Sequence, residues 1–165
     1  ASLGEGLLVW YAAKMRQSGA SIEAVRDWVE ENKLRLCHWF TVDDLMFLKR
    51  GGRLSAASAL LGTMLSIKPI LHVDNEGHLV PVGKARGRSA ALRALMEQMK
   101  ETAVNPEEQT IFISHGDSEE DARRLYEMIR EEIGVKDVLI GPICPTIGAH
   151  SGPGTIALFF MGSER

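Results

Sequence analysis

Cysteine is scarce in this chain, and long apolar runs are missing from it. The 165 residues include only two cysteines, Cys37 and Cys144, which form no CxxC motif. Two thiols do not make a disulfide framework, so we expect a reduced, cytoplasmic setting. No apolar run approaches the roughly 20 residues that a membrane-spanning helix requires. The first residues also lack the basic and apolar regions of a signal peptide, and we expect no integral membrane segment.

A large charge of either sign is also missing. The 19 lysines and arginines nearly balance the 22 acidic residues, and the formal net charge is -3. Basic residues gather only over 49–53 and 84–93, which is too little for the basic stripe of a nucleic-acid-binding protein. We therefore expect no nucleic-acid partner. Hydrophobic residues make up 45% of the chain, as in ordinary globular proteins, so one stable core is feasible.

Common signatures of catalytic and metal sites are absent from the sequence. No serine lies in a G-x-S-x-G elbow, and there is neither a Walker A sequence nor a G-x-G-x-x-G after a predicted strand. His38, His72 and His78 are scattered, and no Cys/His cluster has zinc spacing. We therefore expect no metal site and no cofactor.

Hydrophobic periodicity divides the chain into helices and strands. Helices are predicted at 7–15, 22–34, 43–49, 56–65, 89–102 and 119–133, and strands at 36–42, 69–73, 78–82, 110–114, 137–140 and 155–161. Residues 141–154 are rich in glycine and proline and are predicted to be loop. Strands and helices alternate in the later part, which predicts an α/β fold with a mixed, mainly parallel sheet and flanking helices. The first two helices precede every strand, so we expect them to belong to a different domain.

Two segments begin predicted helices and carry cations. Gly51-Gly52-Arg53 lets backbone amides and a guanidinium approach a ligand, which indicates an anion site. The alternative is a tight turn with Arg53 in solvent. Lys84, Arg86 and Arg88 lie where the helix dipole disfavours cations, which indicates an anionic ligand or an acidic partner surface. The alternative there is a solvated basic loop.

Two further candidates follow predicted strands. In Gly148–Gly154, His150 can donate a hydrogen bond to a carboxylate, and the glycines let a ligand touch the main chain. The alternative is a turn histidine bonded to backbone. At His115-Gly116-Asp117-Ser118 we favour helix capping by Asp117 and Ser118 over a hydrogen-bonded His115–Asp117 pair. Either an apolar cavity or ordinary core is lined by the side chains of Leu60, Leu61, Met64, Leu65, Met96 and Met99.

Several segments, in order and at compatible spacing, together resemble one family. The stretch LMFLKRGGRLS at 45–55 resembles a leucine-rich segment ending in Gly-Gly-Arg-Ile/Leu-Ser, and IKPIL at 67–71 resembles a Lys-Pro-Ile/Leu strand. KARG at 84–87 is similar to Lys-x-Arg-Gly. Residues 148–154 resemble Gly-x-His-Thr-Gly-Pro-Gly, with Ser151 in place of threonine, and the first helix is similar to Ser-x-Gly-x-Leu-Val. The family that this resembles is DegV, the fatty-acid-binding proteins of bacteria, and the resemblance covers essentially the whole chain.

The resemblance implies a function without chemistry of its own. DegV proteins have two α/β domains that bury an acyl chain, and members serve as the lipid-binding subunit of a fatty acid kinase. A separate ATP-dependent kinase subunit phosphorylates the carboxylate. The resemblance therefore implies that this chain binds a long-chain fatty acid, such as palmitate or stearate, and presents its carboxylate to that kinase subunit.

The resemblance also assigns roles to residues. His150 matches the histidine that contacts the head-group carboxylate, and Arg53 and Arg86 match arginines near the head group or on the face that docks the kinase. Lys84 and Arg88 flank Arg86 in that docking segment. The remaining matches are binding residues: Ser151, Gly152 and Gly154 around the head group, and Leu61, Met64 and Leu65 along the acyl tail.

Because DegV proteins are longer, the resemblance also implies a domain boundary. Residues 1–35 would be helices left from the N-terminal domain, and residues 36–165 would be the C-terminal α/β domain. Two other functions remain open. One is a small hydrolase or transferase that uses His150 with a nearby carboxylate. The other is a non-binding interaction fragment that forms a homodimer through the face left bare by the missing domain.

Overall fold

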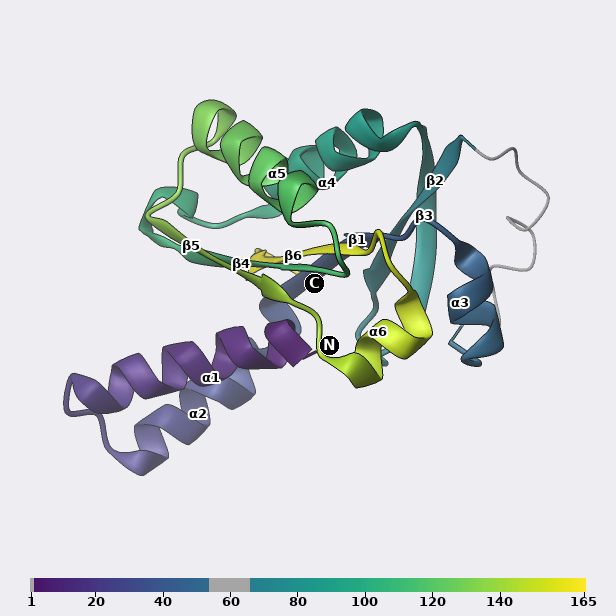
Figure 1. The fold of residues 1–165 in the computed structure, drawn as a ribbon. Coiled ribbons are helices and arrows are strands. Elements are labelled where there is room, and N and C mark those ends of the chain that lie inside the picture. The colour runs from purple at the N-terminus through teal and green to yellow at the C-terminus, as the bar shows by residue number, and fades with distance from the viewer. Residues whose placement is uncertain (1, 54–65) are drawn as a thin grey trace.

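A computed structural model describes residues 2–53 and 66–165, and Figure 1 shows their arrangement. The helix predicted at 56–65 lies outside the described residues, and so do Leu60, Leu61, Met64 and Leu65. Most other predicted elements are confirmed, with bounds shifted by a few residues. In chain order they are α1 (Ser2–Gln17), α2 (Ile22–Asn32), η1 (Lys33–Arg35), β1 (Leu36–Thr41), α3 (Leu45–Arg50), β2 (Ile67–Val73), β3 (Leu79–Arg86), α4 (Arg88–Thr102), η3 (Pro106–Glu108), β4 (Thr110–His115), α5 (Glu119–Glu132), β5 (Asp137–Pro142), α6 (Pro145–Ser151) and β6 (Ile156–Met161).

The strands form one six-stranded mixed sheet in the order β3-β2-β1-β6-β4-β5. The α/β class and the mixed sheet are confirmed. The expected predominance of parallel pairs is wrong, because only β4 and β5 pair in parallel and the other four pairings are antiparallel. The physical reason is the path of β6. This last strand inserts between β1 and β4 and runs antiparallel to both, and alternating elements in a sequence do not reveal such an insertion.

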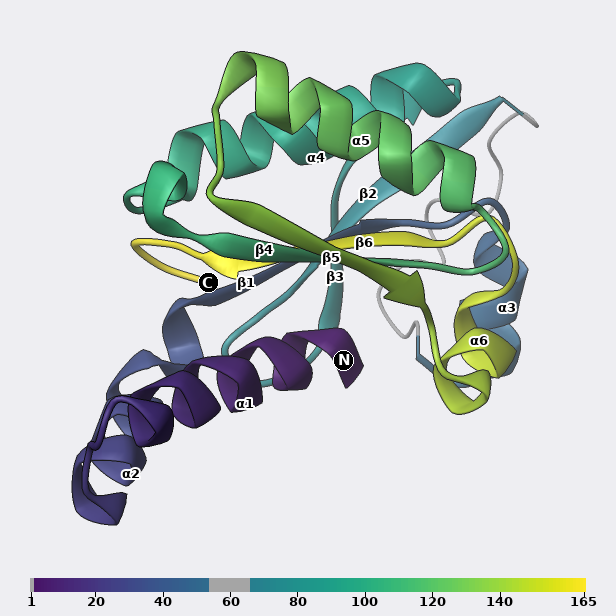
Figure 2. The same cartoon turned by 60° about the vertical axis from the view of Figure 1, so that its left-hand side comes forward.

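Helices cover both faces of the sheet. Figure 2 shows α4 and α5 on one face and α1 on the other. In the same view, α3 and α6 lie at the right, on the side of the sheet that α1 also covers. Side chains alternate along each strand, so Cys37 and Trp39 of β1 join the core under α4 and α5. Leu36 and Phe40 of the same strand face the opposite way. Met96 and Met99 lie on the inner side of α4 and are fully buried in this core, so they belong to ordinary core rather than to a cavity.

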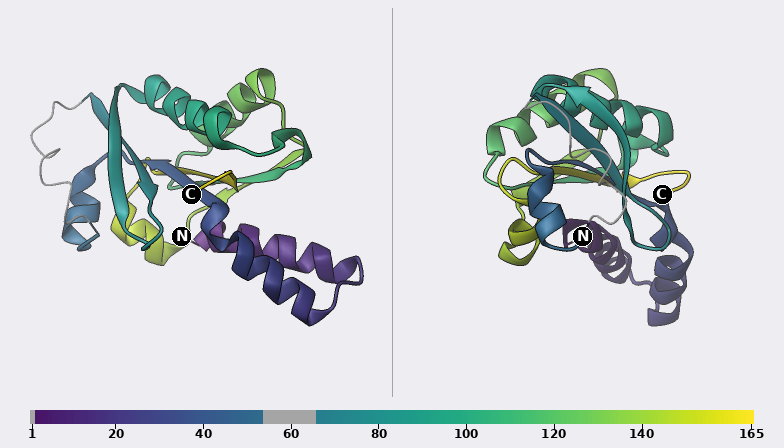
Figure 3. Two further views of the ribbon diagram at one scale, coloured as in Figure 1. Left: turned by 180° about the vertical axis from the view of Figure 1, so that it is seen from behind. Right: turned by 90° about the vertical axis from the view of Figure 1, so that its right-hand side faces the viewer.

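The first helix is not separate from the sheet. Leu7 of α1 has no exposed surface and packs with Phe112, Phe159 and Met161 on the face opposite α4 and α5. That face is apolar enough to bury one side of α1, so this helix packs against the sheet although it precedes every strand. By contrast, α2 has no buried side chain and packs along α1, and the pair projects away from the sheet (Figure 3). The division of the chain at residue 35 stays a prediction.

The glycine- and proline-rich segment contains a helix, so the prediction of loop over 141–154 is wrong. Pro145 is the first residue of α6, where a proline lacks no needed hydrogen bond and its fixed φ favours a helical start. Gly152, at φ 78 and ψ 172, ends the helix after Ser151. His150 therefore lies in the last turn of a short helix rather than in a loop. Within the described parts of the chain, no helix is both long and apolar enough to cross a membrane.

Candidate functional site

An apolar hollow of about 280 Å³ lies on the sheet face opposite α4 and α5. Ala157 of β6 and Ser114 of β4 contribute to it from the sheet, and α3, α6 and the β2–β3 hairpin surround it. The apolar part of the lining includes Phe40, Leu48, Val73, Leu79, Ile147 and Phe159. His150, Arg53 and Thr146 also border the hollow. An apolar cavity with a few polar groups is the usual form of a small-molecule site.

His150 and the Gly51–Arg53 segment, far apart in the sequence, meet in space. A Cβ on Gly51 would overlap Nδ1 of His150, so the absence of a side chain at Gly51 allows the end of α3 to contact α6. Nη1 of Arg53 donates to the carbonyl oxygen of Gly51 at 2.7 Å, and the side chain is exposed. The structure thus brings the Gly51–Arg53 segment and the His150 segment together beside one hollow, which Lys84, Arg86 and Arg88 do not line.

The turn after His150 is closely packed around its glycines. A Cβ on Gly152 would lie 2.6 Å from the ring of Phe47, and a Cβ on Gly154 would overlap the carboxylate of Asp43. Ser151 is buried, and its hydroxyl donates to the carbonyl oxygen of Ile147 at 3.1 Å. The hydroxyl of Ser151 is therefore bonded within α6, whereas Gly152 and Gly154 lie where the turn leaves no room for a side chain.

His38 is a site residue that sequence reasoning missed. It lies on β1 beside the hollow, is only 5% exposed, and contacts the ring of Phe159 edge-on at 5.5 Å between centroids. Burial lowers the pKa of His38 to about 3, so the ring is neutral at pH 7. The available signal was its position between Leu36 and Phe40, with which it shares one face of the strand.

The predicted docking cations differ in their surroundings. Lys84 and Arg86 end β3 and are exposed at the edge of the sheet. Arg88 is mostly buried: its Nε lies 2.7 Å from Asp121 Oδ2, and its Nη1 lies 3.3 Å from Asp43 Oδ1. Its guanidinium is thus engaged in ion pairs that tie α4 to α5 and to the segment before α3.

The strand end at His115 is arranged differently from the prediction. The side chain of Ser118 makes no capping hydrogen bond to α5. Instead, the backbone amide of Ser118 donates to Nδ1 of the buried His115 at 3.2 Å. Capping by the hydroxyl of Ser118 is therefore wrong: Ser118 has φ -146 and ψ 48 rather than the extended backbone that usually directs a capping hydroxyl at the first turn.

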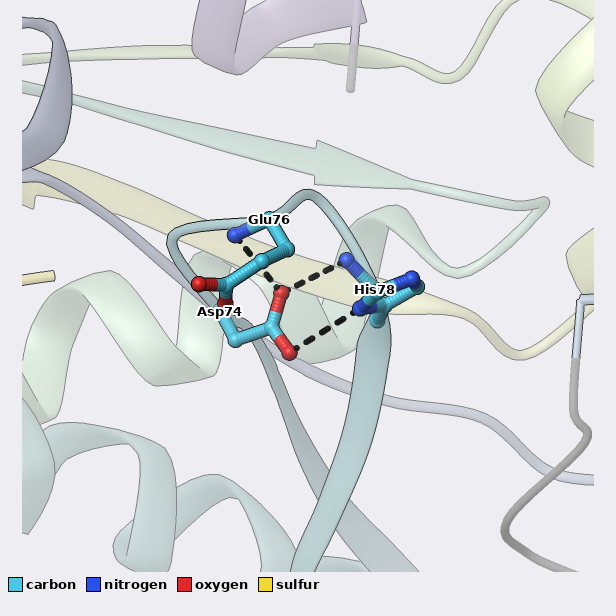
Figure 4. A group of neighbouring side chains, drawn as sticks. All are labelled: Asp74, Glu76 and His78. Carbon is cyan, nitrogen blue, oxygen red and sulfur yellow. Dashed lines mark hydrogen bonds and ion pairs between the residues drawn. The ribbon is translucent and has the colours of Figure 1, made fainter.

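Three potential metal ligands come together in the turn between β2 and β3, as Figure 4 shows. Oδ1 of Asp74 accepts from the backbone amides of Glu76 at 3.1 Å and His78 at 2.8 Å. The bond from His78 is the main reason why the pKa of Asp74 is lowered. Glu76 and His78 are exposed. These bonds build a hairpin turn around an aspartate, which accounts for the arrangement without a metal.

Comparisons with known proteins agree with the sequence resemblance. The family described as "Uncharacterised protein, DegV family" matches residues 1–163. A DegV domain-containing protein of Clostridium perfringens is 53% identical over 165 residues, which is 100% of this chain and 57% of that protein. The chain thus spans little more than half the length of this relative.

Solved structures share the fold. One described as "Fatty Acid Binding of a DegV family Protein from Thermus thermophilus" is 31% identical with a TM-score of 0.85, covering 97% of this chain and 57% of that chain. Another is described as the Streptococcus pneumoniae Fatty Acid Kinase (Fak) B3 protein loaded with linoleic acid. It is 21% identical with a TM-score of 0.84, covers 95% of this chain and 55% of its own, and shows the fold alone. The match over nearly all residues and the close relatives show that this chain belongs to the DegV family.

Proposed function

We propose that this chain binds the acyl tail of a long-chain fatty acid in the hollow, with the carboxylate beside His150 and Arg53. The observation that carries the proposal is an apolar hollow bordered by an imidazole and a guanidinium. Each buried methylene contributes about 0.8 kcal/mol, so a tail supplies affinity without any chemistry. A carboxylate leaving water needs compensating donors, which these two side chains can provide. The Thermus thermophilus relative described as fatty-acid-binding supports the same ligand class.

The surroundings of His150 favour a binding role over catalysis. Within residues 2–53 and 66–165, no carboxylate lies within ion-pair distance of His150. A general base is normally oriented by such a partner. We therefore infer that this chain performs no reaction itself and holds its ligand without a cofactor.

Fatty-acid binding can be measured directly on the purified chain. We expect lipid extraction and mass spectrometry to recover a saturated acid such as palmitate or stearate. After delipidation, His150→Leu should weaken binding of added palmitate roughly 10- to 100-fold, because leucine cannot donate a hydrogen bond to the carboxylate. His78→Leu is the matched control: the side chain of His78 is exposed on the hairpin turn, so this variant should bind palmitate as wild type does. Equal affinities of wild type and His150→Leu would contradict the head-group assignment, and absence of any binding would contradict the function.

We further propose that Lys84 and Arg86 dock an acidic surface of a separate, ATP-dependent kinase subunit that acts on the carboxylate. These side chains are exposed at the β3 edge of the sheet, whereas Arg88 supports the segment through its ion pairs. Complementary charge of this kind mainly raises the rate of association.

The docking surface can be tested by charge reversal. Arg86→Glu should slow association with the kinase subunit roughly tenfold or more, and high salt should diminish the difference. Lys136→Glu serves as control, because it makes the same charge change next to β5, at the opposite edge of the sheet. If both variants slow association equally, net charge rather than this surface governs the encounter. Surface plasmon resonance at two ionic strengths gives these rates.

A further inference from the structure

Two separate apolar clusters share the sheet face opposite α4 and α5. One lies near α3 and contains Phe40, Val42, Leu48, Leu71 and Val73. The other lies under α1 and contains Leu7, Leu36, Phe112, Phe159 and Met161. Ala157 is half-buried and packs against both clusters. The hollow therefore interrupts what would otherwise be one continuous apolar layer, and Ala157 lies at the interruption.

The strand register explains why the hollow lies there. β6 lies between β1 and β4, as Figure 1 shows, so side chains form rows across the three strands. One row is His38–Phe159–Phe112, in which every side chain is a ring. The next row toward α6 is Phe40–Ala157–Ser114, in which two of three side chains are small. Neighbouring strands are only about 4.8 Å apart, so two adjacent small side chains leave a depression in the sheet surface.

We propose that Ala157 is the residue that determines acyl-chain selectivity, by leaving room in the sheet for the tail of the bound fatty acid. This inference rests on the proposed function and adds to it the position that limits tail length. Phe159, two residues along the same strand, shows how a large side chain at an equivalent position fills the face. A bulky side chain at Ala157 would likewise occupy the depression and connect the two clusters.

The proposal predicts opposite effects on stability and on binding. Ala157→Leu should raise the Tm of the lipid-free protein by about 2–4 °C, because it buries apolar surface between the clusters. The same substitution should weaken palmitate binding roughly tenfold or more, as expected when two tail methylenes lose their place. The shorter laurate should bind the variant within about threefold of wild type, because its tail extends less far. A substitution that merely damaged the fold would lower the Tm and weaken the binding of both palmitate and laurate.

Differential scanning calorimetry and displacement of a fluorescent fatty acid measure both effects. Ala157→Val adds less volume and should give a smaller change of selectivity in the same direction. Ala13→Leu is the matched control, because Ala13 is exposed on α1 and should leave Tm and selectivity unchanged. Equal palmitate-to-laurate selectivity in wild type, Ala157→Val and Ala157→Leu would overturn the role of Ala157 alone. A wild-type chain that binds neither acid would instead overturn the proposed function.

Discussion

Gly152→Ala is expected to destabilise the protein by about 2–6 kcal/mol. Gly152 has φ 78 and ψ 172, a backbone conformation that is essentially confined to glycine and costs other residues roughly 1–3 kcal/mol. A Cβ there would also lie 2.6 Å from the ring of Phe47, and relieving such an overlap costs about 1–3 kcal/mol more. Urea denaturation followed by circular dichroism measures the change.

Gly87→Ala separates the two contributions. Gly87 has φ 85 and ψ 165, almost the same conformation as Gly152, but a Cβ there would meet nothing within 4 Å. This variant should lose only the roughly 1–3 kcal/mol of backbone strain. If both variants lower the free energy of unfolding equally, the contact between Phe47 of α3 and the Gly152 turn does not add to the cost of a side chain at Gly152. Close packing beside His150 would then not stabilise the site.

Acidification from pH 7 to pH 5 is expected to destabilise the protein by about 2 kcal/mol through His38 alone. The pKa of His38 is about 3 in the folded protein, compared with the ordinary value of 6.5. Below pH 6.5 the unfolded chain therefore binds a proton that the folded protein excludes. The stability is fully present above pH 6.5 and is lost as the pH falls toward 3, which fixes the sign of the change.

His38→Phe tests this assignment, because it keeps a ring against Phe159 but removes the titration. Unfolding free energies at pH 7 and pH 5 should differ by about 2 kcal/mol less in the variant than in wild type. Some acid sensitivity should remain, because burial also lowers the pKa of His72. Asp74 has a lowered pKa as well, but its contribution is lost only below its ordinary pKa, outside this range. An unchanged difference in His38→Phe would mean that another group carries the acid sensitivity.

Local patterns predicted most of the elements and one tight turn. Asp74 and Gly77 sit where a hairpin turn needs a side-chain acceptor and a positive φ, and the hairpin forms there. The helical spacing of apolar residues in 119–133 was sufficient to predict α5, and Ala122, Leu125 and Ile129 on its apolar side are buried. Such features depend on residues a few positions apart, whose interactions are nearly the same in any fold.

Features of the site were harder to predict where they depend on distant pairing. His38 and Phe159 contact each other only because β6 pairs with β1. Arg88 forms its ion pairs only because Asp43 and Asp121 lie beside the start of α4. The helix α6 was missed because glycine and proline usually interrupt helices, whereas here they begin and end one.

The amino-acid sequence was enough to identify the family, the α/β class and most element positions, and it predicted His150, Arg53 and the glycines as site residues. Motif spacing and side-chain periodicity are local properties, so they can be recognised without knowing how distant parts of the chain pair. Three features are visible only in the folded protein: β6 runs antiparallel between β1 and β4, Gly51 contacts His150, and Ala157 borders a hollow. The reason is physical: each of these depends on which strands pair and in which register, and pairing is chosen by the burial of the whole apolar face rather than by neighbouring residues.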